Sequence, residues 1–465
     1  MKKRSSGVFL LSITTALLFS GLIFAADDDF PVRAPAAVKG TTEAMLAPSF
    51  WIGRIENPER ELMTHKEIKT LNEINAARII PEDNPYRKNI DKIEKDGPIF
   101  NVVDPLSVTI DMADVRKRLE INNERLLSGT FYDSWNLPLT DEKKAEMLDA
   151  VNMAALPQTL EPEYGVIVAH STARLYPTAE AAYRMRGYLD DNSVSSLDIA
   201  MPVAVIHSSK SGDYCFVLSP IAWGWVPATD IAFGSAAKIR NYRDADDCIV
   251  SITHKTPYYA DKGMKRYMGH LYLGERLKLD KKAGDMYRVT VPVRDADGSL
   301  EFKKGWAPVS DAVSEGYLPY TQENVITTAF QLLGRQYGWH DSWDERDCGG
   351  IMRVIFNCFG FTLPRYWSYE QLCSDRAAYV GDMEDLDRKS ARLTTFPEGV
   401  TFTGSTGHIG LYLGSVDGIP YCIHQCGWNY KDGGKEYKMA RTVVSDYINV
   451  GFRMKSIGYF SPMLP

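Results

Sequence analysis

The sequence lacks an excess of basic residues, since 53 Lys and Arg residues are outnumbered by 60 Asp and Glu residues and the formal charge is -7. Proteins that bind nucleic acid through its phosphates need basic surface. We therefore expect no nucleic-acid partner. Sugar and peptide ligands remain compatible with an acidic chain.

Beyond residue 24 the sequence lacks any apolar run that approaches the ~20 residues of a bilayer-spanning helix. The apolar run Val8–Phe24 follows three basic residues and precedes Ala25, Ala26 and three aspartates. This layout is typical of a secretory signal peptide, here residues 1–25. Serine, threonine and glycine interrupt the run, which argues against a membrane anchor. We expect a periplasmic or secreted protein with no stable membrane insertion after cleavage.

Cysteine is scarce, and its number is odd. No cysteine follows the apolar run to accept a lipid, so a free protein is favoured over a lipoprotein. At least one thiol should stay unpaired, and the other six cysteines allow about 15 pairings, so the pairing stays open. The seven cysteines are Cys215, Cys248, Cys348, Cys358, Cys373, Cys422 and Cys426.

Three regions with different sequence patterns follow the predicted signal peptide. Residues 26–160 mix helix-like stretches with proline-bearing connections and predict a mainly helical or irregular segment. Residues 161–240 and 241–318 consist of short β-branched and aromatic runs, each set ending in Gly-Trp, a small apolar residue and Pro. Runs of this length, separated by turns, predict two copies of a small SH3-like β-barrel.

Residues 319–465 place helical patterns before strands, the α+β order of papain-like folds. Helices are predicted over 323–337 and 348–359, and strands over 408–416 and 420–426. The predicted fold class is therefore α+β, with a papain-like catalytic domain after two barrels and the N-terminal segment.

Cys348 is the candidate nucleophile. A cysteine attacks as its thiolate, and a helix N-terminus or a neighbouring histidine lowers its pKa. The string Arg346-Asp347-Cys348-Gly349-Gly350 ends a polar loop and opens an apolar-periodic helix, so the thiol should lie at the positive end of the helix dipole. Free backbone amides there can help hold an oxyanion. Taken alone, a buried structural cysteine is the more common explanation of such a residue.

His408 and His424 change that balance. His408 opens one predicted strand, and His424 lies on the next strand. A plain two-residue turn at Asp417-Gly418 would oppose Leu411 to His424 and place His408 on the other sheet face. A longer or bulged turn opposing Tyr412 to His424 would place both imidazoles on one face. A cysteine, a base and a residue that orients the base would then lie together, and this combination predicts nucleophilic catalysis.

The residues Cys422, His424 and Cys426 stand at alternate positions, a pattern that also suggests a metal site. Alternate strand residues lie ~6.8 Å apart. One tetrahedral ion with bonds of about 2.0 to 2.3 Å does not reach all three comfortably. We expect no metal and no cofactor.

With these residues in place, the chain resembles the NlpC family of papain-like cell-wall cysteine peptidases, in the multidomain form with two bacterial SH3-like domains and an N-terminal stabilising segment. The resemblance extends over nearly the whole mature chain. It rests on Leu318-Pro319-Tyr320-Thr321, Tyr337-Gly338-Trp339, Asp347-Cys348, Leu363-Pro364-Arg365, Gly407-His408 and Ile423-His424.

The resemblance implies cleavage of the bond between D-γ-glutamate and a diamino acid in peptidoglycan stem peptides, with a preference for a free N-terminal L-alanine. It makes Cys348 the nucleophile, His408 the base and His424 the residue that orients His408. It also implies that Tyr337 supports the oxyanion and that Asp347 and Ser368 bind substrate. The first SH3-like domain is expected to wall the pocket.

Two departures touch the specificity pocket. The family has Asp-Cys-Ser-Gly where this chain has Gly349 in place of the serine. The stretch after Arg365 is bulkier than usual, and Ser368 is matched to the family's serine there. Two other interpretations stay open: a non-catalytic cell-wall binding protein, and an amidase or acyltransferase on the same fold.

Overall fold

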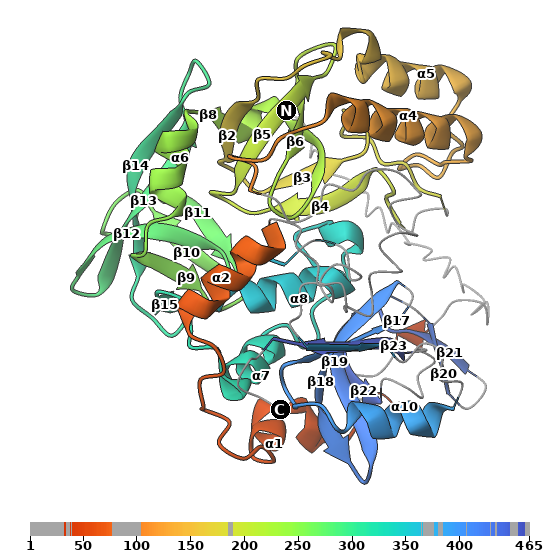
Figure 1. Cartoon of the computed structure of the whole chain (residues 1–465), viewed down its shortest axis with the longest axis vertical. Coiled ribbons are helices and arrows are strands. Elements are labelled where there is room, and N and C mark those ends of the chain that lie inside the picture. Colours follow the sequence, from red (N-terminus) through yellow and green to blue (C-terminus); the bar gives the residue numbers. More distant parts are fainter. Residues whose placement is uncertain are drawn as a thin grey trace, which may run out of the picture.

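The computed structural model has the α+β class that the sequence predicts, with helices and mostly antiparallel sheets (Figure 1). The predicted signal peptide, residues 1–25, lies outside the described residues. Within the described part of the chain no helix is both long and apolar enough to cross a membrane. The structure describes residues 32–33, 38, 40–76, 104–184, 189–363, 365, 376–379, 385–405, 407–427, 429–432, 435–446 and 454–460.

The N-terminal segment packs in two different places. Its first part holds η1 (Glu43–Leu46), α1 (Pro48–Ile52) and α2 (His65–Ala76), and buries its apolar side chains in the core of the C-terminal domain. Its second part holds α4 (Met112–Ser128), α5 (Asp141–Ala150) and η2 (Met153–Ala155), and packs on the first barrel. In Figure 1, α1 lies beside α7 (Gln322–Phe330) while α4 and α5 lie beside the first barrel.

The first barrel is one seven-stranded sheet with the order β4-β3-β7-β6-β5-β2-β8. Its strands are short and largely buried, as expected for a sheet that curls around its own core. The short helices η3 (Ala228–Asp230) and α6 (Ala236–Arg243) flank its last strand. The strands are β2 (Glu163–Ile167), β3 (Ser171–Arg174), β4 (Ser193–Leu197), β5 (Pro202–Ser208), β6 (Tyr214–Leu218), β7 (Trp223–Pro227) and β8 (Ile231–Phe233).

The second barrel repeats the first strand for strand, with the order β11-β10-β14-β13-β12-β9-β15. The repeated Gly-Trp pairs occupy matching places, since Trp225 pairs with Arg174 and Trp306 pairs with Tyr259. Its strands are β9 (Cys248–Ser251), β10 (Lys255–Tyr259), β11 (Tyr267–Tyr272), β12 (Arg276–Ala283), β13 (Met286–Arg294), β14 (Leu300–Pro308) and β15 (Val313–Glu315).

The C-terminal domain packs helices on one six-stranded sheet of order β16-β23-β17-β18-β19-β22. A second sheet of order β1-β21-β20 joins β1 (Val32–Arg33) to the far end of the chain. The helices are α7 (Gln322–Phe330), η4 (Trp339–Asp341), α8 (Cys348–Asn357) and α10 (Leu386–Leu393). The strands are β16 (Arg376–Tyr379), β17 (Thr401–Ser405), β18 (His408–Val416), β19 (Ile419–Cys426), β20 (Asn429–Asp432), β21 (Lys435–Lys438), β22 (Arg441–Asp446) and β23 (Met454–Tyr459).

Helix α8 lies at the centre of the molecule. It contacts β18 and β19 on one side, and the loop that precedes it contacts β4 of the first barrel (Figure 1). Residues 351, 352, 354, 355 and 356 are buried on nearly every side of the helix. A helix buried all round needs partners on all its faces, and here the C-terminal sheet, α7 and the barrels supply them.

Candidate active site

Cys348 is the first residue of α8, as the sequence predicts. Asp347 caps the helix, because its Oδ1 accepts the backbone N–H of Gly350 at 2.9 Å. The Cys348 side chain is nearly buried, and its Sγ donates to the carbonyl oxygen of Gly407 at 3.9 Å. The thiol therefore lies at the positive end of a helix dipole and beside the residue that precedes His408.

Two histidines and a serine form a hydrogen-bonded row across three adjacent strands. Nε2 of His408 on β18 lies 2.9 Å from Nδ1 of His424 on β19. Nε2 of His424 lies 2.7 Å from Oγ of Ser445 on β22. All three side chains are buried. The hydrogen bonds fix both rings, and the outer one is anchored by a serine that the sequence reasoning missed.

The two imidazoles share one face of the sheet because of a β-bulge. The turn at Asp417-Gly418 has two residues with positive φ (52° and 79°), so Val416 pairs with Ile419. The register then shifts between Tyr412 and Gly414, and Tyr412 pairs with Cys422. The predicted pairing of Tyr412 with His424 is wrong in detail. A bulge within the strand, not in the turn, restores the shared face.

Burial keeps both rings neutral. It lowers the pKa of His408 well below its ordinary value, and the neighbouring His424 adds to the effect. Burial alone lowers the pKa of His424 to about 3. A neutral imidazole offers one unprotonated nitrogen as an acceptor, and the lowered pKa values argue against a standing positive charge on this pair.

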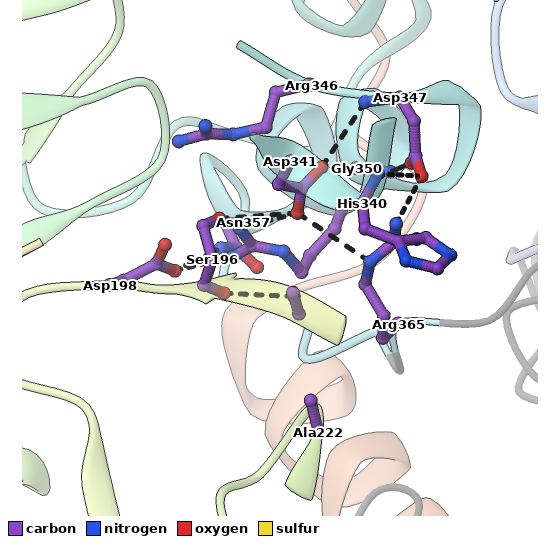
Figure 2. Close-up of polar contacts among 12 residues, drawn as sticks. Ser196, Asp198, Ala222, His340, Asp341, Arg346, Asp347, Gly350, Asn357 and Arg365 are labelled. Atoms are coloured by element: carbon purple, nitrogen blue, oxygen red, sulfur yellow. Dashed lines mark hydrogen bonds and ion pairs between the residues drawn. The ribbon is translucent and has the colours of Figure 1, made fainter. Parts of the chain in front are cut away.

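Asp347 has both carboxylate oxygens engaged inside the protein. Besides capping α8, it accepts the backbone N–H of His340 at 3.2 Å through Oδ2. The same oxygen accepts a hydrogen bond from the Arg365 guanidinium (Figure 2). Its side chain is 5% exposed. Asp347 thus holds the first turn of the helix, and its role toward a substrate amine stays a prediction.

The remaining candidates are placed as follows. Tyr337 is half-buried, its backbone N–H donates to the Ala440 carbonyl at 2.9 Å, and its ring lies against Gly427. It forms an isolated parallel bridge with Arg346, two positions before the thiol. Gly349 is buried in the first turn of α8. Ser368 lies outside the described residues, so its predicted role stays open.

The cysteines and the metal-like pattern give no competing site in the described part of the chain. Cys215, Cys248, Cys358 and Cys422 are buried and carry free thiols. Burial raises the pKa of Cys422 well above its ordinary value. No group of three His, Cys, Asp or Glu side chains is arranged to hold a metal ion among the residues that the structure describes.

Comparisons with known proteins agree with this architecture. Residues 188–227 match the family described as SH3 domain (SH3b1 type). A solved NlpC/P60 endopeptidase from Photobacterium damselae subsp. piscicida superposes with a TM-score of 0.68 at 16% identity, over 93% of this chain and 100% of that one. The chain has the NlpC/P60 fold with an SH3 domain. A Bacillus cereus ATCC 10987 NlpC/P60 family protein gives a TM-score of 0.45 at 16% identity, over 64% of this chain and 100% of that one.

A curated relative adds similarity in sequence. The γ-D-glutamyl-L-lysine dipeptidyl-peptidase of Bacillus subtilis (strain 168) is 31% identical over 117 residues. The match covers 25% of this chain and 37% of the length of that protein. Together with the NlpC/P60 fold and the SH3 domain, this similarity is consistent with an NlpC family protein, as the sequence motifs indicate.

Proposed function

We propose that this protein is a cysteine endopeptidase that hydrolyses the bond between D-γ-glutamate and a diamino acid, such as diaminopimelate, in peptidoglycan stem peptides. The observation that carries the proposal is the row His408–His424–Ser445, which begins beside a cysteine at a helix N-terminus. The NlpC/P60 fold and the name of the Bacillus subtilis relative support the class of substrate.

The row has one arrangement of protons that makes His408 a base. If Nε2–H of His424 donates to the Ser445 hydroxyl, Nδ1 of His424 is an acceptor. Nε2–H of His408 then donates to that acceptor, and Nδ1 of His408 keeps its lone pair. In the other arrangement Nδ1 of His408 carries the proton. With its hydroxyl as acceptor, Ser445 would therefore select, through His424, the tautomer in which His408 accepts a proton from Cys348.

In the acylation step the Cys348 thiol gives its proton to His408, and the thiolate sulfur attacks the γ-carbonyl carbon of D-glutamate. The carbonyl π electrons move to oxygen, and backbone N–H groups of the first turn of α8, with Tyr337, would hold the resulting oxyanion. Collapse of this intermediate breaks the C–N bond. The leaving amine takes the proton from His408, and a thioester remains on Cys348.

In the deacylation step a water molecule replaces the amine. His408 takes a proton from the water, and the oxygen attacks the thioester carbonyl. Breakage of the C–S bond returns the proton to the sulfur and releases a free γ-carboxyl group. The net reaction consumes one water molecule and yields an L-Ala-γ-D-Glu dipeptide and a diamino acid fragment, and no further reactant is required.

Substrate preference and location complete the proposal. A substrate with a free N-terminal L-alanine is favoured, with the first barrel walling the pocket, because β4 and the loop before Cys348 are in direct contact. The layout of residues 1–25 supports action in the periplasm or after secretion. Peptidoglycan stem peptides are the partner in either place.

The proposal is tested by digestion of L-Ala-γ-D-Glu-diaminopimelate and of its glycan-linked counterpart, with the products read by mass spectrometry. Wild-type protein and Cys348→Ala are compared, with Cys358→Ala as a matched control at the other end of α8, where the thiol is buried and bonds to the Val354 carbonyl. We expect L-Ala-γ-D-Glu from wild type and Cys358→Ala only.

Other outcomes point elsewhere. Cleavage of the free peptide alone would support the preference for a free amine, and cleavage of both substrates equally would contradict it. Cleavage at a different bond would indicate an amidase or acyltransferase. No cleavage by any of the three proteins, with retained binding to intact wall, would leave a non-catalytic wall-binding protein.

A further inference from the structure

The loop between Gly338 and Arg346, just before the candidate nucleophile, has an unfavourable backbone. His340, Asp341, Trp343 and Asp344 all have positive φ, at 50°, 61°, 58° and 61°. Residues with a Cβ rarely adopt this conformation, and they hold it only where their surroundings fix them in place. A loop with four such residues must therefore be held by contacts outside itself.

Asp341 is the centre of those contacts. Its carboxylate is fully buried: Oδ1 accepts the backbone N–H of Asp347 at 3.3 Å, and Oδ2 accepts the Ser196 hydroxyl at 3.3 Å. Figure 2 shows Asp341 between Ser196 on the barrel strand and the start of α8, where Asp347 caps the helix and Gly350 lies in its first turn. A Cβ added at Gly350 would lie 1.9 Å from Oδ1 of Asp341. This carboxylate therefore supports the residues on both sides of Cys348.

Charges of alternating sign extend from Asp341 in both directions. Toward the barrel, Arg353 lies 3.9 Å from Asp341 and 2.5 Å from Asp198, which follows β4. Toward the site, Arg365 lies 3.8 Å from Asp341 and pairs with Asp347. The five side chains form a row that we name the buried ion chain: Asp198, Arg353, Asp341, Arg365 and Asp347. Burial works to raise the pKa of Asp341, but the guanidinium groups of Arg365, Arg346 and Arg353 outweigh it and lower the pKa.

Stability alone is a poor reason for such a row. Buried ion pairs lose about as much in desolvation as they gain, and apolar residues often replace them without loss. A row of alternating charges is nevertheless sensitive to its ends, because removal of one terminal charge leaves the next one with a single charged partner. Arg353 without Asp198 would turn toward Asp341, and Asp341 would then move relative to Asp347 and Gly350.

We propose that Asp198 and Asp341 are positioning residues, through which the seating of the first barrel sets the first turn of α8 and so the placement of Cys348. The barrel would then act on the reaction rate and not only on substrate access. The proposal rests on the peptidase function for its activity readout. The chemical reactivity of Cys348 provides a readout that does not depend on that function.

The test compares Asp198→Asn with wild type in the full-length protein. Asp104→Asn is the control for loss of an ion pair elsewhere: it breaks a partly exposed pair with Arg243 (2.6 Å) that joins the N-terminal segment to α6 without touching the buried ion chain. Three quantities are measured: kcat and KM on the stem peptide, the rate of iodoacetamide alkylation of Cys348 from pH 5 to 9 read on the Cys348 peptide by mass spectrometry, and Tm.

We expect Asp198→Asn to lower kcat and the alkylation rate about tenfold or more with KM within about twofold, since small misplacements of reacting groups have large effects on rate. Asp104→Asn should lower Tm and change neither rate. Wild-type alkylation and kcat in a folded Asp198→Asn protein would overturn the proposal. If that variant does not fold, Ser196→Ala replaces it, and we expect its kcat and alkylation rate to fall about threefold. Unchanged rates in Ser196→Ala would then overturn the proposal.

A second test addresses the contact between Asp341 and Gly350. Gly350→Ala alone should slow alkylation about 100-fold, because its Cβ meets the Asp341 carboxylate. In an Asp341→Ala background that obstacle is gone, so adding Gly350→Ala should cost no more than about twofold. If Gly350→Ala slows alkylation by the same factor in both backgrounds, the two substitutions act independently and the proposal is overturned. Failure of the peptidase function would appear differently, as absent turnover with the alkylation pattern intact.

Discussion

Replacement of Ser445 by alanine tests the row of hydrogen bonds behind His408. The change removes the hydroxyl group that lies 2.7 Å from Nε2 of His424, at a place where both side chains are fully buried. His424 must then leave an N–H without an acceptor or move its proton to Nδ1. The second choice forces Nε2 of His408 to accept and places a proton on Nδ1 of His408, the nitrogen proposed as the base.

The size of the effect follows from the hydrogen bond that is lost. A buried hydrogen bond between neutral groups contributes about 0.5 to 1.5 kcal/mol net. At 1.36 kcal/mol for each factor of ten, this corresponds to an about 2- to 13-fold smaller fraction of enzyme with the competent tautomer. We expect kcat to fall by about that factor. KM should be unchanged, because Ser445 lies behind both imidazoles on the third strand.

Steady-state kinetics on the stem peptide measure the effect. Ser251→Ala is the matched control, because Ser251 is a fully buried serine of the second barrel whose hydroxyl lies 2.7 Å from that of Thr256. It loses a comparable hydrogen bond far from the histidines, and kcat should stay at the wild-type value. A Ser445→Ala enzyme with undiminished kcat would refute the tautomer argument, whatever its stability.

Two further expectations concern stability. Burial lowers the pKa of His424 to about 3, so below pH ~6.5 the unfolded chain binds more protons than the folded one, and lowering the pH from 6.5 to 5 should cost about 1 to 2 kcal/mol of stability from this residue alone. Urea unfolding of wild type and His424→Gln at both pH values should show a smaller pH dependence of stability in the variant. An equal pH dependence in the two proteins would contradict this expectation. Trp51 is 0% exposed, and its Nε1 donates to the Met45 carbonyl at 2.9 Å. Urea unfolding should therefore show that Trp51→Ala lowers the free energy of unfolding by about 3 to 5 kcal/mol. Truncation of the exposed Trp135 to alanine should change this free energy little.

Local sequence signals predicted the elements that hold the site. The change from polar loop to apolar period at Cys348 marks the start of α8, and the Asp417-Gly418 pair marks a turn whose two positive φ values such residues tolerate. The repeated Gly-Trp pairs mark matching strands of two barrels. A side chain at Gly224 would lie 2.8 Å from the Arg174 carbonyl oxygen, and one at Gly305 would lie 2.7 Å from Val291. For α8 and the turn the physical cause lies within a few residues of the signal, whereas for Gly224 the repeat itself is the signal and the neighbour, Arg174, comes from another strand.

Most of the features that the sequence reasoning missed depend on distant partners. Arg353 pairs with Asp198, 155 positions earlier, and nothing in the helical period around Arg353 identifies that partner. Ser445 becomes informative only once β22 is known to pair with β19. The bulge in β18 did leave a local sign, because Gly414 beside it has a φ of 138° and glycine within a strand often marks a bulge. Gly414 therefore locates the bulge in the sequence. The sheet face on which both imidazoles pack follows only from the folded sheet.

The two-part packing of the N-terminal segment has a consequence for how the protein is made. The Thr41 hydroxyl donates to the carbonyl of Val444, 403 residues further along the chain, and Trp51 and Met63 belong to the same core as α8. Residues near 40 leave the ribosome long before their partners exist, so this core cannot close domain by domain during synthesis. A chain interrupted before β18 would lack the strands that complete the core around α1, and it would lack both histidines and the serine of the row. The row of His408, His424 and Ser445 can therefore form only after residue 445 has been synthesised.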